Sequence, residues 1–397
     1  MKVAILYSHL KERGGAENVI LKQAELLECK GHNVKCFFAY SDEQLAKDLS
    51  NSSKCYFNSP MPNNEIMRIL LSIPLAPLTF SVFKDVDVLL CHGYGPAPWI
   101  GYALKKTRGL SYVSYIHSPP RFLYLTPEEK KLWRFGKTRE IIYSISKVGQ
   151  QILRKLDLLS VLNSDVVFVN SVFTRRRVEA IYGRRSIVCY PPVDTSVFKP
   201  LDHKITKKMR SNFGWPLIFS TGRIVPVKRW EWLIRIMLYV REAFPSATLA
   251  VAGKISCENS TYVRKLIKLA KSLGISNNVK FLGFKTFDEL VRLYNAADVY
   301  AYPVPNEDFG LGPVEAMACG TPAVVWDDGA GPCETVINGK TGFRAKPYAI
   351  EDFAEKTLKI INPGKENMGE SCVELVKKNF SCAQHIDKLE SALSQVL

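Results

Sequence analysis

No two of the ten cysteines are close enough in the sequence to form a CxxC pair. The spacing therefore excludes paired-cysteine zinc motifs and offers no disulfide framework. The opening residues MKVAILY contain an apolar run too short for an export signal, and we expect them to form a buried strand. Reduced thiols in a cytoplasmic protein are the prediction that follows.

The sequence also lacks an uninterrupted apolar run that could span a membrane. Its most apolar stretch, IMRILLSIPLAPLTFSVF (66–83), contains Arg68, Pro74 and Pro77. Two prolines so close together are expected to break a helix. A broken core helix and a surface that touches lipid both remain open for this stretch.

Acidic residues are scarce relative to basic ones. The chain has 38 Asp and Glu against 54 Lys and Arg, a formal net charge of +16. Nucleic acid, an anionic membrane surface or phosphorylated substrates could balance this charge. No zinc-finger or RNP-type pattern is present, so we do not expect nucleic acid as the partner.

Much of the positive charge lies within residues 130–155, where apolar and aromatic residues alternate with cations. The cluster begins with Lys130, Lys131, Arg134 and Lys137. This pattern is typical of a basic amphipathic helix at a membrane interface, but also of a solvated helix face. We carry both interpretations, and the first predicts peripheral binding to the inner face of a membrane.

Short apolar strands alternate with amphipathic helices, which indicates an α/β protein with parallel sheets. The length of 397 residues fits two domains. A proline-rich polar segment, YPPVDTSVFKPLDHK (190–204), is the predicted linker. We predict an N-terminal doubly wound domain over 1–198, a second over 199–380, and a terminal helix over 381–397 that packs back on the first. Ligands of such sheets bind at the carboxyl ends of the strands.

Two loops at predicted strand ends carry groups suited to phosphate. Gly14 and Gly15 precede a helix, where backbone N–H groups can approach an anion, although such a glycine pair is more often a plain turn than a phosphate site. In STGRIVPVKRWEWLI (220–234), Arg223 and Lys228 follow a strand. A planar guanidinium and a compact ammonium suit a diphosphate, and solvated charge is the alternative.

The segment PNEDFGLGPVEAMACGT (305–321) places two carboxylates around a glycine-rich turn. With Gly312 as N-cap and Pro313 as the first helical residue, Glu315 falls at the third helical position, where glutamate caps a helix. Capping chemistry gives Glu307 no such role. The two carboxylates and the N–H groups of 310–312 together suit a polyhydroxylated ligand.

The stretch NEDFGLGPVEAMACGTPAVVWDDGAGPCETVINGKTGF (306–343) resembles the donor-site motif of the retaining glycosyltransferases of family 4, which have the GT-B fold. The resemblance extends to the Gly14-Gly15 loop, SYIHSPPRFLY (114–124), NSVFTRRRVEAIYGRRSIVCYPPVDTSVF (170–198) and GRIVPVKR (222–229). The segments HSPPRFLY and YPPVDTSVF are most similar to mannosyltransferases of lipid-linked or polysaccharide glycan assembly. One departure is the loop GAGPCE (329–334), where many members have Gly-Gly before a glutamate.

The resemblance implies a GT-B protein whose two Rossmann-like domains face each other across a cleft. It assigns site residues as follows: Gly15, Arg223 and Lys228 for the donor diphosphate; Glu315 for the ribose; Glu307, Phe309, Gly310, Leu311 and Gly312 for the hexose; His117 and Glu307 as the catalytic residues.

A metal-free, cofactor-free transfer of a hexose with retained configuration follows from the resemblance, with mannose from GDP-mannose as the predicted donor. The acceptor is predicted to be a glycan, either free or linked to a lipid. No DxD pair follows a strand. Two alternatives remain: a sugar-nucleotide epimerase of the same fold, and a non-enzymatic protein that binds polyanions.

Overall fold

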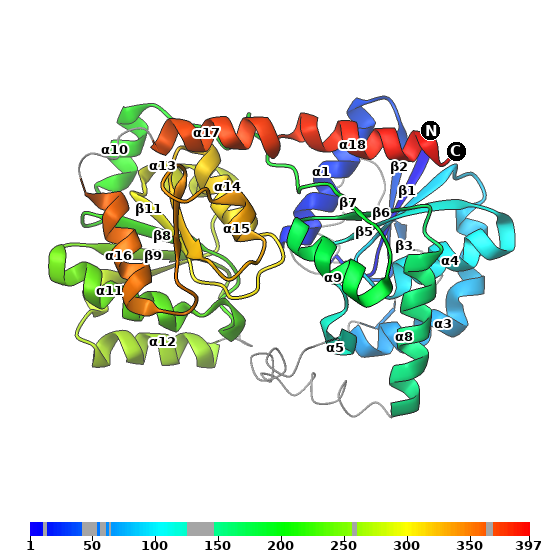
Figure 1. Ribbon diagram of the computed structural model, residues 1–397, viewed down its shortest axis with the longest axis horizontal. Helices are drawn as coiled ribbons and strands as arrows, with labels where there is room; N and C mark the ends of the chain where they lie inside the picture. The colour runs from blue at the N-terminus through cyan, green and yellow to red at the C-terminus, as the bar shows by residue number, and fades with distance from the viewer. Residues whose placement is uncertain are drawn as a thin grey trace. The chain divides into compact units, whose positions relative to one another are not determined.

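The computed structural model describes residues 1–10, 14–41, 54–55, 61–62, 65–124, 147–255, 260–362 and 368–397. The chain divides into two compact units, one formed by 1–192 with 382–397 and the other by 193–381. The first boundary lies inside the predicted linker 190–204, and the terminal helix belongs to unit 1. Each unit is described separately below (Figure 1).

Unit 1 is built on a parallel sheet of seven strands in the order β3-β2-β1-β4-β5-β6-β7. The strands are β1 (Lys2–Tyr7), β2 (Asn33–Phe38), β3 (Lys54–Cys55), β4 (Val88–His92), β5 (Ser111–Ile116), β6 (Val166–Val169) and β7 (Ile187–Val188). Nearly every residue of β1, β4 and β5 is buried, as continuous apolar runs covered on both faces require. The sequence predicts strands at 2–7, 33–39, 87–91, 112–116, 165–169 and 186–189, which six of the observed strands match, whereas the two-residue β3 was not predicted.

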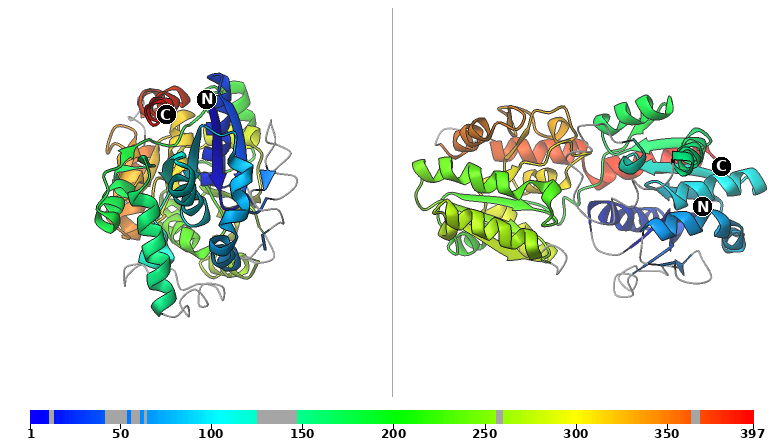
Figure 2. Two further views of the ribbon diagram at one scale, coloured as in Figure 1. Left: turned by 90° about the vertical axis from the view of Figure 1, so that its right-hand side faces the viewer. Right: turned by 90° about the horizontal axis from the view of Figure 1, so that it is seen from below.

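Helices lie on both faces of this sheet (Figures 1 and 2). They are α1 (Gly15–Cys29), α3 (Glu65–Thr79) with the 3₁₀ turn η1 (Phe80–Phe83), α4 (Pro96–Arg108), α5 (Arg121–Tyr124), α8 (Lys147–Leu162), α9 (Val172–Tyr182) and α18 (Cys382–Gln395). The last helix packs against α1, where the Gln23 amide and the His385 ring lie 2.9 Å apart.

The prediction that Pro74 and Pro77 break a helix is wrong: both lie inside α3. Each proline removes a bond to the carbonyl four residues earlier, which here belongs to Leu70 and Ile73. Both residues are exposed, at 46% and 40%, so solvent can satisfy those carbonyls. The opposite face of α3 packs into the core of unit 1.

Unit 2 contains a parallel sheet of six strands in the order β10-β9-β8-β11-β12-β13. The strands are β8 (Leu217–Thr221), β9 (Thr248–Ala252), β10 (Val279–Gly283), β11 (Val299–Tyr302), β12 (Ala323–Trp326) and β13 (Gly342–Ala345). This is a doubly wound order, and β8 and β11 lie side by side where the direction of winding reverses. Such a switch point is where doubly wound sheets bind ligands.

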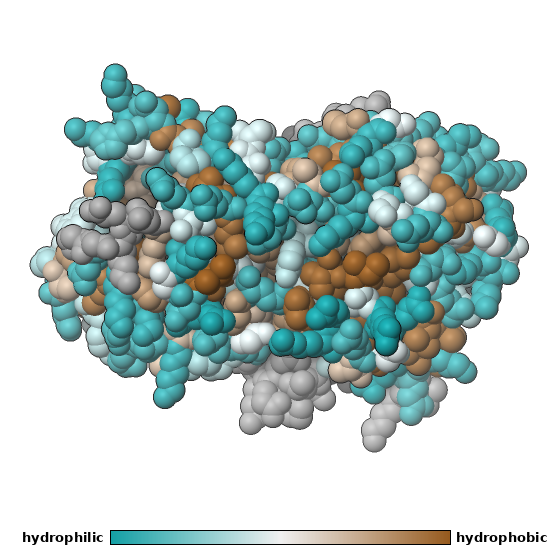
Figure 3. Space-filling model, turned by 45° about the horizontal axis from the view of Figure 1, so that its top comes forward, coloured by the Kyte–Doolittle hydropathy of each residue, from teal (hydrophilic) through white to brown (hydrophobic). Residues whose placement is uncertain are grey.

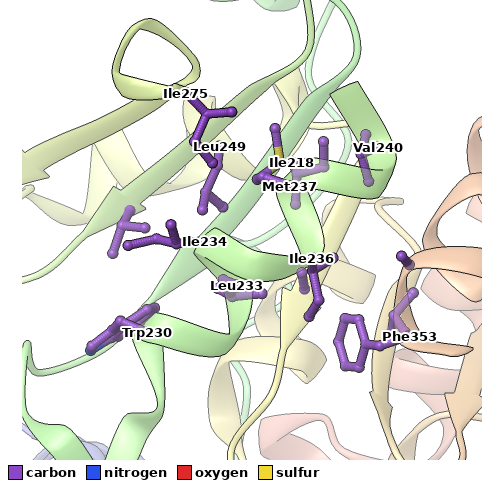
Figure 4. Close-up of a cluster of buried hydrophobic side chains, with 14 of the residues drawn as sticks. Ile218, Trp230, Leu233, Ile234, Ile236, Met237, Val240, Leu249, Ile275 and Phe353 are labelled. Atoms are coloured by element: carbon purple, nitrogen blue, oxygen red, sulfur yellow. The ribbon is translucent and has the colours of Figure 1, made fainter. Parts of the chain in front are cut away.

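The helices of unit 2 cover both faces of its sheet. They are α10 (His203–Arg210), the 3₁₀ turn η2 (Pro226–Lys228), α11 (Trp230–Ala243), α12 (Ser260–Ser272), the turn η4 (Ser276–Asn278), α13 (Phe287–Ala296), α14 (Leu311–Ala318), α15 (Pro332–Thr335), α16 (Ile350–Ile361) and α17 (Met368–Asn379). Figure 4 shows the core between α11, α16 and the sheet, where Trp230, Met237 and Phe353 are almost fully buried.

Polar residues cover most of the face seen in Figure 3, with apolar residues gathered in a few patches. Among the described residues, no helix combines the length and the apolar character that crossing a bilayer requires.

Candidate functional site

Three side chains meet at the switch point of unit 2. The Lys228 ammonium, in η2 after β8, donates to Glu307 Oε2 at 2.5 Å. The Tyr302 hydroxyl, at the end of β11, donates to the same oxygen at 2.8 Å and accepts from Lys228 at 3.0 Å. Lys228 and Glu307 are about one-fifth exposed, so the group is mostly shielded but open to a ligand. The sequence predicted both charged residues, but not the tyrosine.

The loop between β8 and α11 is held by backbone contacts. The Trp230 indole donates to the Arg223 carbonyl at 3.1 Å, and this tryptophan is fully buried. Gly222 has φ +147°, and the ring of Trp230 lies 3.5 Å from where a Cβ would stand there. The loop is therefore fixed at its centre, while the Arg223 side chain is exposed at its rim.

The loop that carries Glu307 is held by hydrogen bonds with the loop that follows β12. Asp328 accepts from the Asn306 N–H at 2.9 Å and from the Ala330 N–H at 3.1 Å. Gly331 donates its N–H to the Glu307 carbonyl at 2.9 Å, and a Cβ on Gly331 would collide with the backbone of Asp308. The unusual GAGPCE loop thus fixes the backbone of Glu307.

The alternative role of Glu315 as a helix cap, which the sequence left open beside ribose binding, is wrong. Helix α14 begins at Leu311 with Gly310 as N-cap, because Gly310 takes φ +83°, where glycine carries no steric penalty. Gly312 is consequently inside the helix rather than its cap. Glu315 instead accepts from the Tyr294 hydroxyl at 2.7 Å. Burial raises the pKa of the Glu315 carboxyl, and this hydrogen bond partly offsets the rise.

A tyrosine array underlies both carboxylates. Tyr294 and Tyr300 each contact Thr221 Oγ1, at 3.1 and 2.8 Å. Burial raises the pKa of the Tyr294, Tyr300 and Tyr302 hydroxyls, so all three remain protonated donors at neutral pH. Each carboxylate therefore receives a phenolic hydrogen bond from below: Glu307 from Tyr302 and Glu315 from Tyr294.

The residues predicted to hold a hexose through their amides lie at the N-terminus of α14. The Phe309 ring is 3% exposed and packs on Phe380, so a ligand at this helix start would not meet the ring itself. Gly310 and Gly312 run directly over Tyr302 and Tyr300, and neither has room for a Cβ without a shift. Backbone N–H groups at such a helix start favour an anion or an electron-rich oxygen.

In unit 1, His117 follows β5 and pairs with His92 at the end of β4. The His92 Nδ1 and His117 Nε2 atoms are 3.0 Å apart, and the rings stack at 5.3 Å. Burial and the neighbouring His385 lower the pKa of His117 to about 3. Burial, with His117 and His385 nearby, also holds the pKa of His92 well below its ordinary value. Both rings are therefore neutral at physiological pH.

A pocket of about 80 Å³ lies at the carboxyl ends of β1, β4 and β5. Its lining is Tyr7, Ser8, His9, Ala16, Gly93, Tyr94, His117 and Ser118. Gly15, predicted to approach a phosphate, begins α1 next to Ala16 and is exposed. The Glu17 carboxylate lies close to this helix start. A Cβ on Gly14 would stand only 2.6 Å from Glu17 Oε2. The structure thus brings His117 to this pocket and Gly15 to its edge.

Within the described part of the chain, no three His, Cys, Asp or Glu side chains are grouped so as to hold a metal ion. Asp328 supports a loop instead, as shown above. The metal-free mechanism remains a prediction. The basic residues Lys130, Lys131, Arg134 and Lys137 lie outside the described residues.

Several neighbours of the predicted site were not found from the sequence: His92, Thr221, Tyr294, Tyr300, Tyr302 and Asp328. A signal existed for one pair. Tyr300 and Tyr302 alternate along a strand with Val299 and Ala301, which places the tyrosines on one face and the small apolar residues on the other. Val299 and Ala301 indeed belong to the core with α11.

Comparisons with known proteins agree with this architecture. The family model "Glycosyltransferase Family 4" matches residues 13–197, and the model "Glycosyl transferases group 1" matches residues 203–378. Among solved structures, HepE of Anabaena in complex with UDP and glucose has a TM-score of 0.79 at 20% identity and covers 100% of both chains. Sucrose-phosphate synthase of Thermosynechococcus elongatus has a TM-score of 0.81 at 19% identity, over 99% of this chain and 98% of its own. At these identities the likeness concerns the fold.

Curated relatives are similar over part of their length. A D-inositol 3-phosphate glycosyltransferase of Corynebacterium aurimucosum is 31% identical over 249 residues, which is 59% of this chain and 58% of the relative. A GDP-mannose-dependent alpha-(1-6)-phosphatidylinositol monomannoside mannosyltransferase of Mycolicibacterium smegmatis is 32% identical over 215 residues, 51% of this chain and 53% of the relative. The matched region spans little more than half the length of these relatives.

Proposed function

Because the chain belongs to the glycosyltransferases of family 4, we propose that it transfers a hexose from a sugar nucleotide to a glycan acceptor. The observation that carries the proposal is the meeting of Lys228 and Glu307 at 2.5 Å, at the switch point of unit 2 and beside the N-terminus of α14. A cation, a carboxylate and the backbone N–H groups of a helix N-terminus at one place match the diphosphate and hydroxyl groups of a sugar nucleotide.

In this proposal each donor group has its own residues. Arg223 and Lys228 bind the diphosphate, and the family resemblance also assigns a phosphate-binding role to Gly15. The Glu315 carboxylate accepts from the ribose hydroxyls. Glu307 and the amides of Phe309, Gly310, Leu311 and Gly312 hold the hexose, and His117 contacts the sugar at the reacting centre.

The proposed reaction retains the anomeric configuration and needs neither metal nor cofactor. Lys228, Arg223 and the α14 amides stabilise the negative charge that grows on the departing diphosphate. The acceptor hydroxyl attacks from the same face, and an oxygen of the leaving phosphate takes its proton. Glu307 and Glu315 serve donor binding rather than acting as the acid and base pair of a glycosidase. Transfer that survives a chelator would support this mechanism, whereas strict dependence on added Mn²⁺ or Mg²⁺ would exclude it.

For the donor we propose GDP-mannose, and for the acceptor a lipid-linked glycan or a related polyol phosphate. The relative whose name includes GDP-mannose and phosphatidylinositol monomannoside supports both parts, and the inositol 3-phosphate relatives support a phosphorylated acceptor. A net charge of +16 suits such a partner.

We further propose that the protein binds an anionic membrane surface peripherally. One face of α3 is apolar and exposed, and consists of Met67, Leu70, Ile73, Pro74, Pro77 and Leu78. Cations flank it: Lys84 is exposed just after η1, and the Arg108 guanidinium donates to the Phe80 carbonyl at 2.6 Å. An apolar stripe with basic neighbours is the composition that lies in a lipid headgroup region. The cluster from Lys130 to Lys137 would add charge to this contact.

The test is a thermal-shift screen with GDP-mannose, UDP-glucose, UDP-N-acetylglucosamine and the matching nucleoside diphosphates, followed by product analysis with and without acceptor. We expect GDP-mannose to give the largest shift and transfer to require the acceptor. A changed sugar nucleotide formed without acceptor would indicate an epimerase. Salt-sensitive binding to any polyanion, with no response to sugar nucleotides, would indicate a polyanion-binding protein.

A further inference from the structure

The Tyr302 hydroxyl closes a ring of three hydrogen bonds with the two charged groups of the candidate donor site. It lies 3.0 Å from Lys228 Nζ and 2.8 Å from Glu307 Oε2, and those two atoms are 2.5 Å apart. Tyr302 is 5% exposed, and burial, with the nearby carboxylates, holds the pKa of its hydroxyl well above the ordinary value. The proton therefore stays on the phenol, which donates to Glu307 and accepts from Lys228.

The surroundings of Tyr302 keep its ring in one place. The ring stacks on Tyr300 with centroids 6.1 Å apart, and the Lys228 ammonium lies 5.4 Å from the ring centre. A Cβ on Gly310 would lie 3.3 Å from the ring edge. The hydroxyl is thus a fixed donor beneath the glycine turn, and not a side chain that can turn away.

A diphosphate that enters this site competes with Glu307 for Lys228. When the ammonium turns toward the phosphates, Glu307 loses its charged partner at Oε2. The phenol is the donor that stays on this oxygen, since it is buried and rigid. This hydrogen bond restrains the Oε2 atom, so the carboxylate presents a better defined acceptor to the hexose than it would without the phenol.

We propose that Tyr302 is a positioning residue of the donor site, which keeps the Glu307 carboxylate oriented toward the hexose after Lys228 has turned to the diphosphate. The inference rests on the proposed function and adds a residue to it. It predicts an effect that depends on the hexose, because Glu307 contacts the sugar and not the nucleotide.

The test is Tyr302→Phe, which removes one oxygen and keeps the ring. We expect kcat/KM for transfer to fall by about tenfold or more, the size of one hydrogen bond to a charged group. We expect the Kd of the free nucleoside diphosphate to change by less than about threefold, since the group lost acts on the sugar side. The melting temperature should stay within a few degrees of the wild type, as roughly expected for one hydrogen bond.

Tyr294→Phe is the matched control, because Tyr294 donates to Glu315 as Tyr302 does to Glu307. This variant should raise the Kd of the sugar nucleotide and that of the nucleoside diphosphate by the same factor, since Glu315 is assigned to the ribose, which both ligands contain. A role in stability alone would produce no such difference between the two variants. The double variant Tyr302→Phe with Glu307→Gln should be no worse than Glu307→Gln, since the tyrosine acts through this carboxylate.

The inference is overturned if Tyr302→Phe transfers at the wild-type rate, if it weakens both ligands equally, or if it fails to fold, which would assign the hydroxyl to stability. If the wild type transfers the hexose and Tyr302→Phe transfers it at the same rate, only this inference is removed and the proposed function stands. A wild type that binds no sugar nucleotide removes the proposed function, and the inference with it.

Discussion

The His92 Nδ1 and His117 Nε2 atoms share one proton across 3.0 Å, from the ends of two neighbouring strands. Both rings are neutral at physiological pH, so one donates its N–H and the other accepts. His92 is fully buried, and its Nε2 has no hydrogen-bond partner among the residues that the structure describes. His117 lines the pocket of unit 1, so a group bound there meets a ring whose orientation is fixed by its hydrogen bond with His92.

The first prediction concerns acid. The pKa of His117 is lowered to about 3, that of His385 to about 4, and that of His92 well below its ordinary value. Below pH 6.5 the unfolded chain binds protons on these residues that the folded chain does not. Stability should therefore be complete above about pH 6.5 and fall toward pH 4, by roughly 1.4 kcal/mol per pH unit for each histidine.

Urea unfolding at pH 7.5, 6.0 and 5.0 measures this loss. His385→Gln should reduce the slope by one proton, because Gln does not titrate. A slope that is the same in this variant would contradict the assignment of a neutral, buried His385.

A second prediction concerns Asp157, which lies in α8 with 1% exposure and accepts from the Tyr182 hydroxyl at 2.7 Å. Burial raises the pKa of its carboxyl to about 6. A raised pKa means that the ionised form destabilises the fold at neutral pH, and that this cost disappears as the pH falls below about 4. Asp157→Asn should thus stabilise the protein by up to about 3 kcal/mol at pH 8.

At pH 4 the gain should vanish, because the native carboxyl is then protonated as well. Unfolding free energies of both proteins at the two pH values provide the check. An equal difference at pH 8 and pH 4 would assign the effect to packing rather than to ionisation.

Glu307 and Glu315 are the subject of the third prediction. Replacing either with Ala should remove most transfer activity while the fold persists. Loss of one hydrogen-bonded carboxylate should cost on the order of 1.5–3 kcal/mol in donor binding. Because Glu315 bonds to Tyr294 rather than capping α14, Glu315→Ala should act on donor affinity more than on the melting temperature. Calorimetric titration with the sugar nucleotide, beside a melting curve, separates the two effects.

The fourth prediction concerns the cations. Lys228→Ala and Arg223→Ala should weaken binding of the nucleoside diphosphate much more than binding of the nucleoside, because both cations are assigned to the phosphates. Lys228→Ala should have the larger effect, since the mostly shielded Glu307 carboxylate then loses the ammonium that partly neutralises its charge beside the phosphates. Equal loss for nucleoside and diphosphate would place these residues away from the phosphates.

A fifth prediction concerns the membrane. We expect the protein to bind vesicles that contain anionic lipid at low salt and to dissociate as the Debye length falls from about 10 Å to about 3 Å. Changing Lys130, Lys131, Arg134 and Lys137 together to Ser should release it, since each cation near the surface contributes about 1 kcal/mol.

Leu70→Ser with Leu78→Ser should weaken vesicle binding without changing its salt dependence, because these residues belong to the exposed apolar face of α3. Both variants should still transfer to a short water-soluble acceptor. Co-sedimentation with the vesicles is the measurement. If the wild type stays in the supernatant at low salt, the basic cluster is only a solvated helix face.

The sequence by itself determined the alternation of strands and helices and which charged residues follow the strands of the candidate site. Lys228 and Glu307 each follow a strand, and the carboxyl ends of parallel strands share one edge, so the sequence predicts that both lie at that edge, although not that they touch. The periodicity of apolar residues shows which residues lie on the same face of a helix or strand, and this information is local to the sequence.

Only the tertiary structure decided the partners across elements. The start of α14 depends on the positive φ of Gly310, and the partner of Glu315 depends on where α13 packs beside it. The Tyr302 and His92 contacts likewise follow from strand order, which places β8 beside β11 and β4 beside β5. A contact between distant residues depends on topology and register, and no local pattern of residues carries either.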